Sequence, residues 1–68
     1  MNIDEQWFYK KAGDLVVGDI LIRGISRHEV TAIMGSPRNG MTTITLESEY
    51  GNSWPEWLNV TDRLEVAP

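Results

Sequence analysis

The sequence predicts an all-β fold, a small barrel of five to six short antiparallel strands. Three observations support this class. Short runs that alternate apolar and polar residues recur about every 8 to 12 residues, with turn-forming residues between them. No stretch shows the length and the periodicity of a long helix. A chain of 68 residues is too short for two full sheets, so closing one bent sheet is the simplest way to hide the strand edges.

Length, cysteine usage and charge limit the organisation and the partners of the chain. A chain this short forms one domain with a marginal core, and we expect residues 1–6 to be a frayed segment and residues 7–68 a single barrel domain. The absence of cysteine fits a reducing cytoplasm, and no apolar run approaches the length of a membrane span. Ten Asp and Glu against six Lys and Arg give a net charge of −4, which disfavours a nucleic-acid partner.

The elements follow from the spacing of apolar and turn-forming residues. Gly18-Asp19 interrupts the most apolar run and predicts a sharp bend into a strand, because Gly18 tolerates positive φ and Asp19 can bond its own downstream backbone. The turns and loops are expected at residues 12–14, 23–26, 35–40, 50–53 and 61–63. The strands expected between them are residues 6–11, 20–22, 27–34, 41–48, 54–60 and 63–66.

Two of these strands carry an irregularity. Within residues 27–34, Ile33 breaks the alternation, and a bulge near Thr31 or Ala32 is expected to bring both Val30 and Ile33 inward. Pro55 cannot donate a ladder hydrogen bond, so it marks a sheet edge or a bulge. The residues expected to be buried in the core are Ile20, Val30, Ile44, Leu46, Leu64 and Val66.

The turn and core residues also carry a resemblance to known proteins. The residues concerned are Asp14-Leu15, Val17-Gly18-Asp19-Ile20, Gly24, Arg27, Val30-Thr31-Ala32-Ile33 and Asp62-Arg63-Leu64-Glu65-Val66. This pattern resembles a group of small uncharacterised proteins from actinobacteria and their phages, whose fold is Src-homology-3-like (SH3-like). The resemblance covers about residues 12–67 and implies an SH3-like barrel, a phage origin and the cytoplasm of a bacterial host.

No combination of residues predicts catalysis, metal binding or a cofactor. His28 is the single histidine, and its neighbour Glu29 points to the opposite face of a strand, which rules out a base paired with that carboxylate. The serines lie in turns or at strand ends, and the glycines are spread singly instead of forming a phosphate-binding loop. We therefore predict that the protein is not an enzyme, with no catalytic residues, no metal ligands and no cofactor.

The aromatic residues near the second half of the chain are the most informative cluster. Trp54 and Trp57 fall on opposite faces of their predicted strand, so at least one is expected to be exposed. An exposed tryptophan is a typical interface anchor. We predict a partner-binding surface at Tyr50, Trp54, Glu56 and Trp57; the alternative is that both indole rings cap the open ends of the barrel as packing.

Three hypotheses of function follow. The leading one is a non-enzymatic protein-binding module, a phage-encoded accessory factor acting on a host protein through an aromatic and acidic surface. The second is a nucleic-acid-binding small barrel, which the negative charge disfavours. The third is a homo-oligomeric structural or regulatory protein that uses Trp54 or Trp57 at a two-fold contact. The expected partner is thus another protein or a second copy of the chain, with no role for a membrane.

Overall fold

The computed structural model describes residues 9–35 and 40–68 and has an all-β fold. Its elements in chain order are β1 (Tyr9–Lys11), a 3-10 turn η1 (Ala12–Asp14), β2 (Ile20–Arg23), β3 (Ser26–Ile33), β4 (Met41–Ser48), β5 (Ser53–Asn59) and β6 (Arg63–Glu65). All strand pairs are antiparallel. The predicted fold class, with its upper limit of six strands, is confirmed. No helix in the described part of the chain has the length and apolar character needed to cross a membrane.

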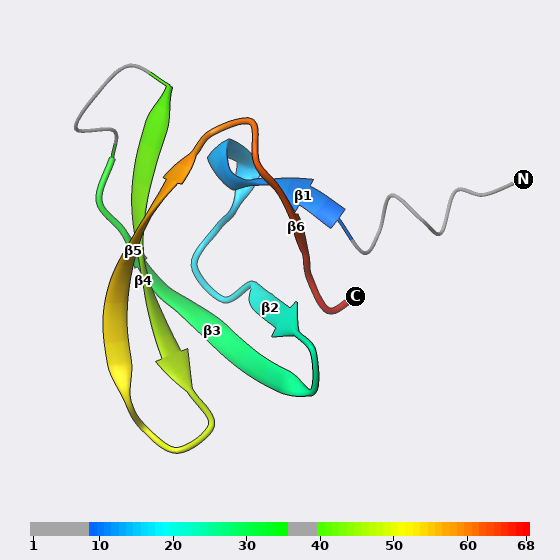
Figure 1. The fold of residues 1–68 in the computed structure, drawn as a ribbon. Helices are drawn as coiled ribbons and strands as arrows, with labels where there is room; N and C mark the ends of the chain where they lie inside the picture. Colours follow the sequence, from blue (N-terminus) through cyan, green and yellow to red (C-terminus); the bar gives the residue numbers. More distant parts are fainter. Residues whose placement is uncertain (1–8, 36–39) are drawn as a thin grey trace, which may run out of the picture.

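The strands form two sheets that bend around one core (Figure 1). A meander gives the order β2-β3-β4-β5, and β1 pairs with β6. A bridge between Leu21 and Val66 joins the two sheets, and the N–H of Ala67 donates to the carbonyl of Ile20 at 2.8 Å. No ladder among residues 9–35 and 40–68 connects β5 to β2. The other edge of β2 is bridged to β6, so the strands run in the order β5-β4-β3-β2-β6-β1, and among the described residues the barrel is open between its outer strands, β5 and β1.

The core lies between the concave side of the meander and the β1-β6 pair. Its buried members are Leu15, Leu21, Val30, Ile44, Leu46 and Val66, with Trp54, Leu58 and Leu64 packed against them. Four of the six predicted core residues are confirmed as buried, whereas Ile20 and Leu64 are only half-buried. For Ile20 the prediction was wrong because alternation along β2 turns the neighbouring Leu21, which is 1% exposed, toward the core instead.

The predicted bulge in β3 is confirmed, and it places Val30 and Ile33 on the same face, opposite the buried Leu46 and Ile44. The register shifts between Val30 and Ala32, and the hydroxyl of Thr31 donates to the carbonyl of Thr45 at 3.3 Å. Val30 is fully buried. Ile33 lies on this inward face but is still 38% exposed, because β3 ends at this residue.

The Gly18-Asp19 bend is confirmed, with Gly18 at φ +102°. Two backbone hydrogen bonds of 2.8 Å fix the bend to β3: the N–H of Gly18 donates to the carbonyl of Val30, and the N–H of Val30 donates to that of Asp19. The side chain of Asp19 bonds upstream instead of downstream. Its carboxylate accepts from the N–H of Val16 at 2.9 Å and pairs with Lys10 at 3.0 Å.

The two ends of the described chain are held by η1, at the turn predicted for residues 12–14. The N–H of Ala12 donates to the carbonyl of Asp62 at 2.7 Å, and that of Gly13 to Val60 at 3.0 Å. A side chain at Gly13 would meet Val60 Cβ at 3.1 Å, so this close approach favours glycine. Of the predicted strand 6–11, residues 9–11 form β1. The predicted frayed segment 1–6 and residues 36–39 of the predicted loop lie outside the described residues.

Candidate functional site

The candidate site lies where two hairpin turns meet at one end of the sheet. In a meander every second turn falls at the same end, and here these are the β2–β3 turn at Gly24 and Ile25 and the β4–β5 turn at residues 49–52. The cross-strand pair of His28 and Ser48 sets the two turns at the same level. Gly24 at φ +61° makes the first turn tight, so Ile25 stands at its tip fully exposed.

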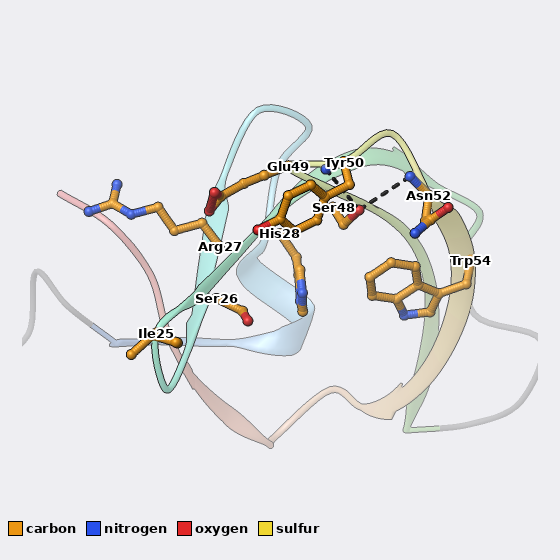
Figure 2. Close-up of a pocket in the computed structure, with 9 residues that line it drawn as sticks. All are labelled: Ile25, Ser26, Arg27, His28, Ser48, Glu49, Tyr50, Asn52 and Trp54. Carbon is orange, nitrogen blue, oxygen red and sulfur yellow. Dashed lines mark hydrogen bonds between the residues drawn. The ribbon is translucent and has the colours of Figure 1, made fainter.

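Ser48 organises the second turn. Its hydroxyl oxygen accepts the backbone N–H groups of Tyr50 and Asn52, both at 3.2 Å (Figure 2). Its own N–H donates to the carbonyl of Asn52 at 2.8 Å, and its carbonyl accepts from Gly51 at 3.1 Å. Serine is suited to this role because its short side chain can replace a backbone acceptor within a turn. Tyr50 on this turn is 89% exposed.

Between the two turns lies a depression of about 300 Å³, here called the hairpin depression (Figure 2). Its lining residues are Ile25, Ser26, Arg27, His28, Ser48, Glu49, Tyr50, Asn52 and Trp54. The imidazole of His28 meets the indole of Trp54 edge to face, with ring centroids 4.9 Å apart. The Nδ1 atom of His28 is buried and has no partner among the described residues. The depression thus combines aromatic surface with a few polar groups, as binding pockets do.

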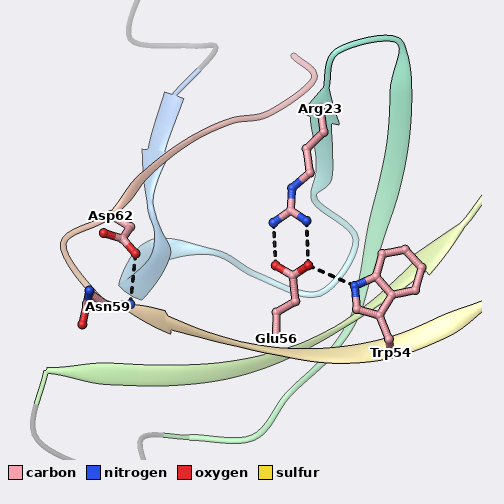
Figure 3. Close-up of polar contacts among 5 residues, drawn as sticks. All are labelled: Arg23, Trp54, Glu56, Asn59 and Asp62. Atoms are coloured by element: carbon pink, nitrogen blue, oxygen red, sulfur yellow. Dashed lines mark hydrogen bonds and ion pairs between the residues drawn. The ribbon is translucent and has the colours of Figure 1, made fainter.

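Trp54 is oriented by a polar network that reaches from β5 across to Arg23 on β2 (Figure 3). Its Nε1–H donates to Oε2 of Glu56 at 3.0 Å. Arg23 at the end of β2 binds both carboxylate oxygens of Glu56, with each N–O distance 2.6 Å. The hydrogen bonds from Arg23, followed by that from Trp54, hold the pKa of Glu56 below its ordinary value although burial opposes them. The same pairing raises the pKa of Arg23.

A second depression of about 230 Å³ adjoins the first and is acidic. It is lined by Ile20, Arg27, Glu29, Glu47, Ser48 and Glu49, of which Arg27, Ser48 and Glu49 are shared with the hairpin depression. Glu29 and Glu47 are direct cross-strand partners, a like-charge arrangement that costs stability. A basic side chain placed between them would relieve this repulsion.

The four predicted partner-binding residues are divided by the structure. Tyr50 and Trp54 line the same depression. Glu56 lies beside Trp54, but its carboxylate is occupied by Arg23 and the indole. Trp57 is 69% exposed. It lies three residues after Trp54 on β5, so alternation places it on the opposite face of the strand. The expectation that the two tryptophans occupy opposite faces is confirmed.

The sequence argument missed His28, Ile25 and the charged rim of Arg27 and Glu49. The strand order could have indicated these residues, because a meander brings the turns at residues 24–25 and 49–52 to one end of the sheet. In residues 9–35 and 40–68, no group of three His, Cys, Asp or Glu side chains is placed to hold a metal ion.

Comparison with known proteins gives a partial similarity. No protein-family model matches the chain, and no solved structure matches it. Two curated relatives are the proteins named Protein Syd from Aeromonas hydrophila subsp. hydrophila and from Aeromonas salmonicida. Each is 32% identical to the chain over 53 residues, which is 78% of this chain and 29% of the relative. The chain is therefore similar to less than a third of the length of these Syd proteins.

Proposed function

We propose that this chain is a non-enzymatic protein-binding module and that the hairpin depression receives a short segment of another protein. The observation that carries the proposal is Tyr50, a residue that is 89% exposed on a turn whose backbone Ser48 fixes by two hydrogen bonds. Because these bonds already order the backbone of the turn, binding has to restrict only the two side-chain torsions of Tyr50. Tyrosine and tryptophan beside a depression are the residues that most often anchor interfaces.

The two adjoining depressions indicate the chemistry of the partner segment. An aliphatic or aromatic side chain suits the space between Ile25 and Tyr50, above the rings of His28 and Trp54. A lysine or arginine one or two positions away in the same partner segment suits the acidic depression, where Glu47 lies opposite Glu29. The same carboxylates would repel a phosphate backbone, which supports a protein partner over a nucleic acid. The resemblance described for the sequence supports a phage accessory factor that acts on a host protein in the cytoplasm.

Selection of binders from a library of random short peptides, displayed against the immobilised full chain, tests this function. We expect the selected peptides to pair an apolar residue with a nearby Lys or Arg. By calorimetry, Tyr50→Ala should weaken their binding at least about tenfold, or about 1.4 kcal/mol. Met34→Ala is the matched control, because Met34 is 70% exposed but lines neither depression; its affinity should equal that of the wild type.

Two outcomes would count against the proposal. Peptides that bind Tyr50→Ala as tightly as the wild type would show that the hairpin depression is not their site. Failure to select any peptide, combined with tight binding of a single-stranded oligonucleotide at physiological salt, would favour the nucleic-acid-binding barrel instead.

A further inference from the structure

The outer edge of β5 carries unpaired backbone groups. Within residues 9–35 and 40–68, β5 pairs with β4 alone. Two hydrogen bonds of 2.8 Å bracket this pairing: the N–H of Ser48 donates to the carbonyl of Asn52, and the N–H of Val60 donates to that of Gly40. Backbone groups in an antiparallel strand face the partner strand at every second residue. The even-numbered residues therefore face β4, and residues 53, 55, 57 and 59 direct their N–H and carbonyl groups away from it.

At two positions, Pro55 and Asn59, fewer outward groups are available to bond a second strand. The N–H of Asn59 donates to the carboxylate of Asp62 at 3.1 Å (Figure 3), and its carbonyl accepts from the N–H of Asp62 at 2.9 Å. Pro55 has no N–H to donate. The outward donors that remain are the N–H groups of Ser53 and Trp57. Neither bonds another group within residues 9–35 and 40–68, and neither do the carbonyls of Ser53, Pro55 and Trp57.

The side chains beside this edge favour contact with an uncharged strand. Trp57 is 69% exposed on the face of β5 that it shares with Pro55, and their partners on β4 are Thr43 and Thr45. Glu56 is the single charged residue between Ser53 and Asn59, and the guanidinium of Arg23 neutralises it. Two β5 strands can thus approach without a free charge between them, although each chain has a net charge of −4.

We propose that the β5 edge is a self-association surface on which the β5 strand of a second copy adds antiparallel across a two-fold axis. One register uses every remaining donor. With Trp57 opposite Pro55 of the other copy, its N–H meets the proline carbonyl and its indole covers the proline ring. Ser53 then lies opposite Asn59, whose carbonyl has a second lone pair available. In each copy the carbonyls of Ser53 and Trp57 gain no donor, because the N–H of Asn59 is held by Asp62 and Pro55 has no N–H, and each Glu56 keeps its own Arg23.

This surface is separate from the hairpin depression, and the two proposals fail independently. Sedimentation equilibrium of the full chain over a range of concentrations should show a reversible dimer. Trp57→Pro removes the outward N–H and the indole but no hydrogen bond to β4, and it should raise the dimer dissociation constant at least about tenfold. Trp57→Thr retains the N–H and should have a smaller effect. Tyr50→Thr is the control: it should leave the dimer intact while abolishing peptide binding.

If Trp57→Pro does not fold, hydrogen exchange measured on the unaltered chain tests the proposed dimer. Hydrogen exchange of the Trp57 amide should slow as the protein concentration rises through the dissociation constant, while exposed amides of the β4–β5 turn do not change. A chain that stays monomeric at millimolar concentration would overturn the proposal, including the case in which β5 accepts a foreign strand only. A dimer whose Trp57 amide exchanges at the monomer rate would overturn it equally.

Discussion

Arg23 and Glu56 connect β2 and β5, which no ladder among the described residues joins, so removing this ion pair tests how much it contributes to holding these two strands together. The pair is bidentate, with both N–O distances 2.6 Å, and Glu56 also accepts from Trp54. A hydrogen bond to a charged group contributes about 1.5 to 3 kcal/mol when buried. The side chains of Arg23 and Glu56 are 37% and 24% exposed, however, so solvent screening reduces the expected coupling to about 1 kcal/mol.

A double-mutant cycle measures that coupling. The free energy of unfolding is determined by urea denaturation for the wild type, Arg23→Ala, Glu56→Ala and the double variant. Glu56→Ala should be the more destabilising single change, by about 1 to 2 kcal/mol, because it leaves both the guanidinium and the Trp54 Nε1–H without a partner. A coupling below about 0.3 kcal/mol would show that the pair is a surface contact of no consequence and that the core alone holds β5 against β2.

The same pair predicts a pH dependence whose sign follows from the pKa of Glu56. Arg23 lowers this pKa first, then Trp54, so the native state binds the proton less readily than the unfolded chain does. The stabilisation is therefore fully present above the unfolded value of about 4.3, and it is lost as the pH falls through the lower pKa of the folded state. The stability difference between the wild type and Glu56→Gln should be constant from pH 7 to about pH 5 and shrink below about pH 4. A difference that grows on acidification would contradict the assignment.

Three further predictions concern stability and are measured by chemical denaturation with circular dichroism. Ile44→Ala should lower the free energy of unfolding by about 2 to 5 kcal/mol, a large share of the roughly 3 to 10 kcal/mol expected for a domain of this size. Ile20→Ala should cost clearly less, because Ile20 is half-buried. Equal costs would show that the β2 register is wrong. Gly18→Ala should cost about 1 to 3 kcal/mol through backbone strain alone, since φ is +102° and open space surrounds the position; a neutral effect would mean that the bend relaxes freely. Ser48→Ala should cost about 0.5 to 1.5 kcal/mol and speed amide exchange in the β4–β5 turn, because two N–H groups lose their acceptor; unchanged exchange would assign the order of that turn to its backbone bonds.

The strands were predictable where one local signal decided them. Residues 41–48 alternate cleanly, and β4 occupies exactly that range. Gly18 and Gly24 marked bends that require positive φ. The inward face of β2 was not predictable, because Ile20 and Leu21 are equally apolar and only pairing with β3 and the bridge to Val66 selects Leu21.

The candidate site was predictable only in part for a related reason. Alternation along β5 was enough to separate Trp54 from Trp57. Local sequence does not contain the contact between Arg23 and Glu56, which joins residues 33 positions apart, so Glu56 was assigned to a partner instead of to Arg23. His28 likewise acquires its neighbour Trp54 from the strand order and not from its sequence neighbours.

The pairing of β1 with β6 has a consequence for how this fold can be combined with other sequences. Tyr9 lies directly opposite Glu65, so the start of β1 and the end of β6 are neighbouring points, beyond which Val66 and Ala67 run along β2. Segments attached at these two points would emerge side by side, as the two ends of a surface loop do. Such a unit can be grafted into an exposed loop of a host protein without stretching the host, and insertion tolerance of this kind is characteristic of folds with adjacent ends. The β1–β6 ladder would then hold the two ends of the inserted domain together and keep it folded.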